Sequence, residues 1–451
     1  MIEFLLPALM VLTLFGGILL GFPVGLVLGG VAAVFLLASD LPMAFFNMMV
    51  SRIYSNALTN WLFLAIPMFI LMGMLLDRTG LARGAFKVTE RLFHRVPGHL
   101  ALTVIFIGGL LAAATGVVGA SVVLLSVLAL PRMLDSGSYT APFAAGLVTA
   151  SGTLAILMPP SVMLIILSGL VSVPVGTLFS AALVPSAMLL GLYALYSVLF
   201  LWWRQRRGRD ATAPNARSDQ GEIETEDGPR GFLQCLYALV PFVVLIPSVL
   251  GAIITGTASP TEASGLGVLG VLLFAGLSGR LRWSVLRLSG RETALSTAMI
   301  MLLVIAATCF SLVFKALGGD GMINALLGLV GQNDWGIILF ILLLVFLLGF
   351  FLDWLEISLI LMPLFAPVVM QLDLGNGLQG TALMAWFAIL FAINLQSSFL
   401  TPPFGVSLFY LKGAVADRVS TGEIYRGVAP FILLQLLVVV IIMVFPQALW
   451  L

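Results

Sequence analysis

Charged residues, cysteine and histidine are scarce in this sequence. Only 9% of its 451 residues are Asp, Glu, Lys or Arg, whereas 61% are hydrophobic and the mean hydropathy is +1.16. Apolar runs of membrane-spanning length recur from end to end, which excludes a soluble globular protein and predicts a polytopic helical membrane protein. The net charge of +1, with its basic residues in short loops, gives no indication of nucleic-acid binding.

The shortage of reactive residue types also limits the chemistry. Cys235 and Cys309 are the only cysteines, too few for a disulfide framework or a zinc site. With no nucleophile, base or metal ligands in register, the sequence does not indicate an enzyme, and no organic cofactor is expected. An ATP-driven pump is disfavoured because the Gly-x-x-x-x-Gly-Lys-Ser/Thr loop is missing, and a channel because a continuous polar pore lining is missing.

Two apolar stretches nevertheless carry small polar residues and a double proline. They are residues 151–161 (SGTLAILMPPS) and 394–404 (NLQSSFLTPPF). Proline removes a backbone donor and clashes with the preceding turn, so we expect broken helices over about 141–172 and 384–411. Paired breaks in two halves of a membrane protein are the best sequence indication of a transport site.

Other motifs repeat in the same order in both parts of the chain. Phe22-Pro23 corresponds to Ser259-Pro260, and Leu130-Pro131 corresponds to Met362-Pro363. These correspondences predict two homologous halves, 1–203 and 236–451, joined by a polar linker at 204–235.

Loop charges indicate that the two halves are inverted. Residues 79–99 are basic, whereas their counterpart at 318–335 carries two acids and no base; 279–291 is basic, whereas its counterpart at 39–59 is nearly uncharged. Basic loops stay on the cytoplasmic side, so corresponding loops lie on opposite sides of the membrane. The linker is then cytoplasmic and both termini are periplasmic.

This topology includes two segments that enter and leave the membrane on one side. They are helical hairpins at about 100–135 and 336–371. The predicted fold is therefore an all-α inverted repeat of about ten transmembrane spans with two re-entrant hairpins and two broken helices.

Five motifs in order give the chain a family resemblance that covers nearly its whole length. They read TGVVGAS at 115–121, SGTL…MPPS at 151–161, SPTEA at 259–263, FLDWLEI at 351–357 and LTPPFG at 400–405. The chain resembles the large (DctM-type) membrane subunit of tripartite ATP-independent periplasmic (TRAP) transporters, and within them a branch often labelled mannitol/chloroaromatic. The resemblance implies a sodium-driven secondary transporter with elevator-type motion in the bacterial inner membrane. It also implies two partners, a small four-helix membrane subunit and a periplasmic substrate-binding protein.

The chemistry of the candidate site follows from the breaks and the hairpin tips. Sodium prefers hard oxygen ligands, which helix breaks supply as backbone carbonyls beside hydroxyl and amide oxygens. The sodium and substrate candidates are Thr115, Gly116, Gly119, Ser121, Ser151, Thr153, Pro159, Pro160, Asp353, Glu356, Ser358, Asn394, Ser397, Ser398, Thr401, Pro402 and Pro403.

Asp353 and Glu356 are the only acids in the apolar run 336–371. A carboxylate at mid-membrane costs about 2.5 to 3.5 kcal/mol on insertion scales, which calls for a partner. For Asp353 the alternatives are cation binding, which makes it the best single sodium candidate, a structural ion pair, or a position facing a cavity. Glu356 is a weaker functional candidate.

The predicted function is sodium-coupled uptake of a small organic acid, such as a 2-oxo acid or a hydroxy acid, delivered by the periplasmic binding protein. The alternative is a stand-alone sodium- or proton-coupled transporter of organic anions that needs no binding protein.

Overall fold

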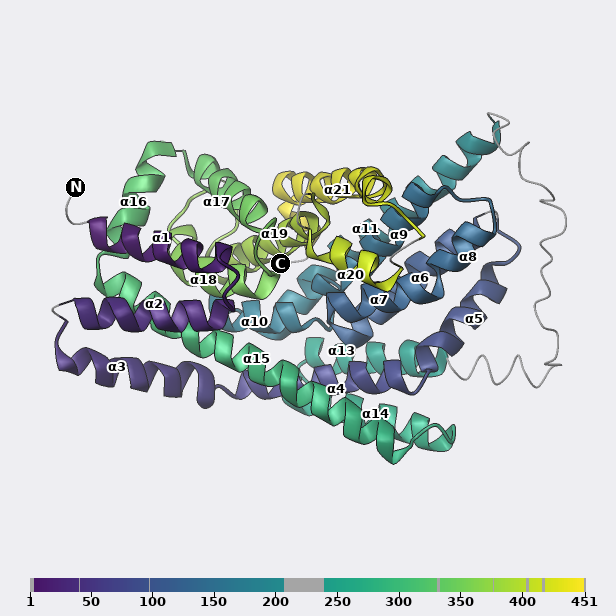
Figure 1. Cartoon of the computed structure of the whole chain (residues 1–451), viewed down its shortest axis with the longest axis horizontal. Coiled ribbons are helices and arrows are strands. Elements are labelled where there is room, and N and C mark those ends of the chain that lie inside the picture. The colour runs from purple at the N-terminus through teal and green to yellow at the C-terminus, as the bar shows by residue number, and fades with distance from the viewer. Residues whose placement is uncertain are drawn as a thin grey trace.

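The computed structural model describes residues 4–39, 41–96, 98–206, 239–330, 333–375, 377–402, 405–415 and 418–449. Within these ranges the chain is helical and contains no strand (Figure 1). Pro403 and nearly all of the predicted linker lie outside the described residues.

Helices of the first half include a hairpin, α6–α8, and a broken helix, α9–α10. They are α1 (Leu5–Leu19), α2 (Val24–Ala38), α3 (Met43–Ile53), α4 (Ala65–Arg78), α5 (Leu81–Phe93), α6 (His99–Thr115), α7 (Val118–Leu128), α8 (Leu130–Asp135), α9 (Ala141–Thr153), α10 (Val162–Val171) and α11 (Val175–Arg206). The helix α11 continues through Arg206, beyond the predicted linker start at Arg204. The Arg206 guanidinium lies 3.8 Å from the ring centroid of Trp202, a contact within this last turn.

Helices of the second half repeat the same order. They are α13 (Ile246–Ile254), α14 (Pro260–Leu277), α15 (Trp283–Ala316), α16 (Gly319–Val330), α17 (Asp334–Leu348), α18 (Trp354–Val369), α19 (Gly380–Leu400), α20 (Val406–Ala414) and α21 (Thr421–Val444). Ser259 begins α14 with a capping box in which Glu262 accepts from the Ser259 backbone. The acid at this position thus has the structural role of an ordinary helix start.

Length and surface both mark the protein as membrane-spanning. Among the described residues, seven helices are long and apolar enough to cross a bilayer, and eight shorter apolar helices of 10–17 residues accompany them. Large apolar side chains lie on the outside, including Leu37 at 87% exposed and Leu433 at 68% exposed. A surface with this much exposed apolar area is favourable in contact with lipid and unfavourable in contact with water.

The two halves interlock through reciprocal helix pairs. The helix α2 packs on α15, and their counterparts α14 and α4 pack on each other. In the same way, α9 packs on α21, and their counterparts α19 and α11 pack on each other. The helix α7 packs on α20, and their counterparts α18 and α10 pack on each other. This exchange is what an inverted repeat produces, so the fold is an inverted repeat with two hairpins and two broken helices.

One of these crossings depends on glycine. A Cβ on Gly146 of α9 or on Gly427 of α21 would overlap the backbone of the other helix. Two backbones approach this closely only where neither residue has a side chain, as is common in membrane helix packing. The crossing thereby fixes α21 against the broken helix α9–α10.

Charged contacts gather the basic loops at one end of the molecule. Arg280 donates to the carbonyl oxygen of Gly80 at 3.1 Å, and Arg132 lies 2.6 Å from Glu90. Arg418 lies 3.2 Å from Asp135. In Figure 1, α5 and α8 mark this basic end, whereas α16 and the start of α1 lie at the opposite end of the long axis.

Candidate functional site

The tip of the first hairpin lies against the first helix break. The helix α6 ends at Thr115, Gly116 adopts a left-handed φ of 59°, and α7 begins at Val118. A Cβ on Gly116 would lie 3.2 Å from the backbone nitrogen of Val162, the first residue of α10. Glycine therefore provides both the turn and the close approach.

Two hydroxyls flank this tip and contact each other. The Oγ1 of Thr115 and the Oγ of Ser121 are 2.9 Å apart, and both residues are buried. Thr115 also approaches the carbonyl oxygen of Leu111 at 2.9 Å. Because a hydroxyl oxygen keeps lone pairs after donating its proton, the pair can present acceptors to a cation.

The first break interrupts the buried helix α9–α10. After Thr153 the chain forms a short 3-10 turn, Leu154–Ile156, and passes through Pro159-Pro160, whose peptide bond is cis. The Thr153 hydroxyl donates to the carbonyl oxygen of Ala150 at 2.8 Å. The Oγ of Ser151 is fully buried and has no hydrogen-bond partner among the described residues. It is therefore an available oxygen at the break.

The second hairpin turns at Asp353. The carboxylate of Asp353 accepts from the backbone N–H of Trp354 at 2.9 Å, which makes it the N-cap of α18. Glu356 completes a capping box by accepting from the backbone N–H of Asp353 at 3.2 Å. The hydroxyl of Ser358 donates to the carbonyl oxygen of Trp354 at 2.6 Å. Both acids thus have a structural role that the sequence interpretation did not consider.

The second break carries a row of hydroxyls at the end of α19. Ser397 donates to Ile393 at 3.0 Å, Ser398 to Leu395 at 2.8 Å, and Thr401 to Ser397, again at 2.8 Å. All three acceptors are carbonyl oxygens of the same helix. The hydroxyl oxygens keep their lone pairs, as they do at the first break.

Contacts join this row to the second hairpin. The side-chain nitrogen of Asn394 donates to the carbonyl oxygen of Leu342 in α17 at 2.6 Å. A Cβ on Gly349, at the end of α17, would overlap the side chain of Ser398. The second hairpin therefore lies on its own half's break, as the first hairpin does, and Pro402 follows at the half-buried end of that break.

Tyr410 connects the two sets of residues, and the sequence interpretation missed it. Its ring lies against Gly119 of the first hairpin, where an added Cβ would be 3.0 Å away. The Asp353 carboxylate also acts electrostatically on the Tyr410 hydroxyl. One side chain of α20 thus lies near both hairpins, a long-range contact that no local pattern signals.

A second group that the sequence did not reveal is a buried polar cluster behind α19. The Nε2 of Gln435 donates to the hydroxyl of Tyr193 at 2.7 Å, and both residues have no exposed surface. Gln396 lies beside the same hydroxyl, and within the part of the chain that the structure describes neither of its amide atoms meets the criteria for a hydrogen bond. The cluster joins α11, α21 and the helix that carries the second hydroxyl row.

The assembled site is rich in neutral oxygens and poor in strong metal ligands. Among the described residues, no group of three or more His, Cys, Asp or Glu side chains is placed to hold a metal ion. Hydroxyls and freed carbonyls suit a weakly held hard cation.

Comparison with known proteins agrees with this arrangement. Residues 11–448 match the family model described as the DctM component of the tripartite ATP-independent periplasmic transporter. The large permease protein UehC of the ectoine/5-hydroxyectoine TRAP transporter of Ruegeria pomeroyi is 30% identical, covering 98% of this chain and 97% of the relative. The large permease protein SiaM of the sialic acid TRAP transporter of Vibrio cholerae is 28% identical, covering 95% and 93%.

A solved structure extends the likeness to the fold. The YdaH transporter of Alcanivorax borkumensis aligns with a TM-score of 0.63 over 94% of this chain and 98% of its own, at 14% identity. The paired breaks, the hairpins and this likeness define a polytopic membrane protein with a transporter fold. The chain belongs to the DctM family of TRAP transporter large permeases.

Proposed function

We propose that this chain carries a small organic acid across the bacterial inner membrane together with sodium ions, as the large permease subunit of a TRAP transporter. The single observation that carries the proposal is the pairing of each helix break with a hairpin tip, with buried hydroxyls at both. One such set lies around Thr115 and Ser121, and the other around Ser397 and Ser398.

Sodium fits these sets because their oxygens are neutral. The hydroxyl protons are donated to carbonyls of the same helices, so lone pairs remain for a cation. We assign Asp353, at the turn of the second hairpin, as the source of a negative charge for the cation, because its carboxylate retains acceptor capacity beyond its bond to Trp354. A cation moved across 100 mV supplies about 2.3 kcal/mol, which can drive uptake without ATP.

An organic acid fits the helix starts beside the breaks. The helices α7 and α10 begin at Val118 and Val162 without a side-chain cap. Their first backbone N–H groups can therefore donate to a substrate carboxylate, which the helix dipole also favours. The relatives are named for ectoine and for sialic acid, so we assign the class of substrate and not the compound.

The proposal includes the orientation, the motion and the partners. The basic end lies in the cytoplasm by the positive-inside rule, which puts the 204–235 linker there and both termini in the periplasm. The hairpins and broken helices move as a unit against the remaining helices. A small membrane subunit and a periplasmic binding protein complete the transporter, and the binding protein selects the acid.

Uptake into proteoliposomes tests the proposal. Vesicles holding this chain and its small subunit are given the binding protein, labelled candidate acids and an inward sodium gradient. We expect accumulation that requires both sodium and the binding protein. Equal uptake in potassium buffer would refute sodium coupling, and equal uptake without the binding protein would favour the stand-alone transporter.

A further inference from the structure

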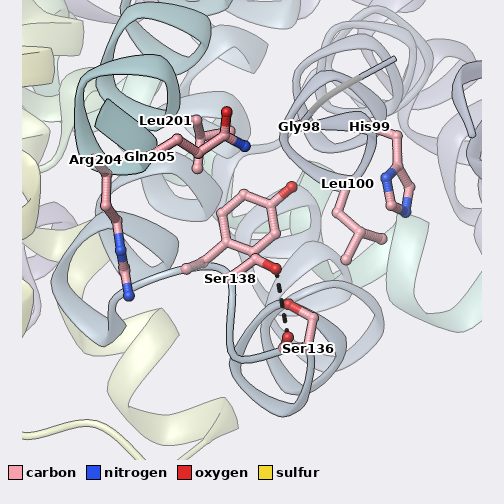
Figure 2. A pocket seen from close by; sticks show the side chains of 9 residues that line it. Gly98, His99, Leu100, Ser136, Ser138, Leu201, Arg204 and Gln205 are labelled. Atoms are coloured by element: carbon pink, nitrogen blue, oxygen red, sulfur yellow. Dashed lines mark hydrogen bonds between the residues drawn. The ribbon is translucent and has the colours of Figure 1, made fainter. Parts of the chain in front are cut away.

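The helices α6 and α11 form a seam that contains two hollows, one polar and one apolar. The polar hollow, here the head pocket, has a volume of about 120 Å³. It is lined at the basic end by Gly98, His99, Leu100, Ser136, Ser138, Tyr139, Leu201, Arg204 and Gln205 (Figure 2). The apolar hollow, here the groove, has a volume of about 360 Å³ and lies further along the same two helices.

The groove is lined entirely by apolar side chains and glycine. Phe93 of α5 and Met158 of the first break contribute, and the rest belong to α6 and α11. Gly191 lies on α11 with no atom within 4 Å of the position that its Cβ would occupy. An absent side chain therefore leaves this part of the groove open.

The two hollows lie along the same helix faces. On α11, Leu190 and Ala194 of the groove are spaced at helical intervals from Leu201 and Gln205 of the head pocket. The helix α6 rises about 15 Å between His99 and Gly109, about half of the 30 Å hydrocarbon core. The seam thus spans one leaflet, from its polar surface toward the bilayer centre.

The head pocket has the charge to receive an anion. Arg204 lines it and supplies a positive charge, and none of the nine lining residues is acidic (Figure 2). The hydroxyls of Ser136 and Ser138 donate to the backbone carbonyl oxygens of Met133 and Ser136, so Arg204 is the group that attracts an anion. Burial raises the pKa of Tyr139 to about 12, although backbone groups of Ala101 and Leu100 hydrogen-bond to it, so its phenol stays neutral at physiological pH. The attraction for a phosphate therefore comes from the Arg204 guanidinium.

We propose that this seam binds one anionic phospholipid, with its phosphate in the head pocket and one acyl chain in the groove. A polar, basic hollow followed by an apolar one over the depth of a leaflet matches the chemistry of a single lipid. The acyl chain would contact Phe93 and Met158, so the lipid would brace the helix α5 against the first hairpin and the first break.

Photolabelling tests the proposal. The full chain is placed in phosphatidylethanolamine vesicles that contain a trace of phosphatidylglycerol with a diazirine in its acyl chain. After illumination, we expect labelled peptides to concentrate at 102–110 and 190–194. Unlabelled phosphatidylglycerol should compete with the photolabel for the seam more strongly than phosphatidylethanolamine does. One basic side chain beside an anionic headgroup strengthens binding by about fivefold.

Two variants and a control separate the parts of the site. Gly191→Leu should fill the groove and reduce labelling there to that of other lipid-facing helices. Gly265→Leu makes the same change at another open position, on α14, and should label as wild type. Arg204→Gln should remove most of the preference for phosphatidylglycerol. If Gly191→Leu fails to fold, the Arg204→Gln result alone tests whether the seam binds an anionic phospholipid.

Three outcomes would overturn the proposal. They are even labelling of all lipid-facing helices, wild-type labelling of Gly191→Leu, and loss of seam labelling when the small membrane subunit is added. The last result would mean that a partner helix covers the seam instead of a lipid.

Discussion

Replacement of Asp353 by Asn and by Ala separates a cation ligand from a helix cap. The carboxylate begins α18 by accepting from the backbone N–H of Trp354 at 2.9 Å. Asn caps a helix nearly as well as Asp, so Asp353→Asn should leave stability almost unchanged, whereas Asp353→Ala should lose about 0.5 to 2 kcal/mol. If Asp353 also binds sodium, either variant loses a charge-assisted contact of about 1.5 to 3 kcal/mol, a roughly ten- to hundredfold weaker sodium affinity.

The assay is the sodium concentration that gives half-maximal uptake, measured beside thermal unfolding in detergent. Glu356→Gln neutralises the second acid of the hairpin turn, and Glu423→Gln is its matched control, because Glu423 completes the same kind of capping box with Ser420 at the start of α21. We expect Glu423→Gln to keep wild-type sodium dependence. Wild-type sodium dependence in Asp353→Asn, together with loss of stability in Asp353→Ala, would make Asp353 a cap only and refute its role in sodium binding.

Three further predictions concern orientation and packing. A cysteine replacing Arg83 should resist impermeant thiol reagents added from the periplasmic side, whereas one replacing Asp320 should react; the reverse would contradict the proposed topology. Gly146→Ala should lower the unfolding temperature or prevent folding, because its Cβ would overlap the backbone of α21, and overpacking typically costs about 1 to 3 kcal/mol; unchanged melting would refute the close crossing. Tyr193→Phe should destabilise the protein by about 1 to 3 kcal/mol by leaving the Gln435 amide unpaired, and adding Gln435→Leu should restore part of the loss; additive losses in thermal unfolding would contradict the pairing.

The elements with local causes could be predicted from the sequence. The double proline at 159–160 lies in the break between α9 and α10 as expected, because proline cannot continue the hydrogen-bond ladder whatever surrounds it. Gly116 lies at the first hairpin tip, in the left-handed region that favours glycine. The apolar runs also predicted helices, because a backbone in lipid must satisfy its hydrogen bonds within its own segment.

The sequence carries a signal for the role of Asp353 as the N-cap of α18, which the interpretation from burial alone did not use. The spacing Asp353-x-x-Glu356 is that of a capping box, the same pattern that begins α14 and α21. A cost of burial alone suggested a cation or an ion pair for Asp353. The competing explanation, a helix start that satisfies the carboxylate with its own backbone, requires no other segment.

Contacts between distant segments could not be predicted from this sequence alone. Tyr410 meets Gly119 only because α20 of one half packs on α7 of the other. Tyr193 and Gln435 are each isolated polar residues in apolar helices, and only the packing of α11 on α21 joins them. Such pairs depend on the reciprocal arrangement of the halves, which a motif in one helix does not encode.

In the proposed transporter, the two helix breaks, each with its hairpin tip, hold the coupling cations. The most direct measurement is an experimental structure of the complete transporter in saturating sodium and in a sodium-free buffer, with thallium as an electron-dense substitute for the ion. We predict ion density beside the Thr115–Ser121 pair and beside Ser397 and Ser398, lost in the sodium-free state. Density at neither break, or at a position elsewhere in the protein, would contradict the claim.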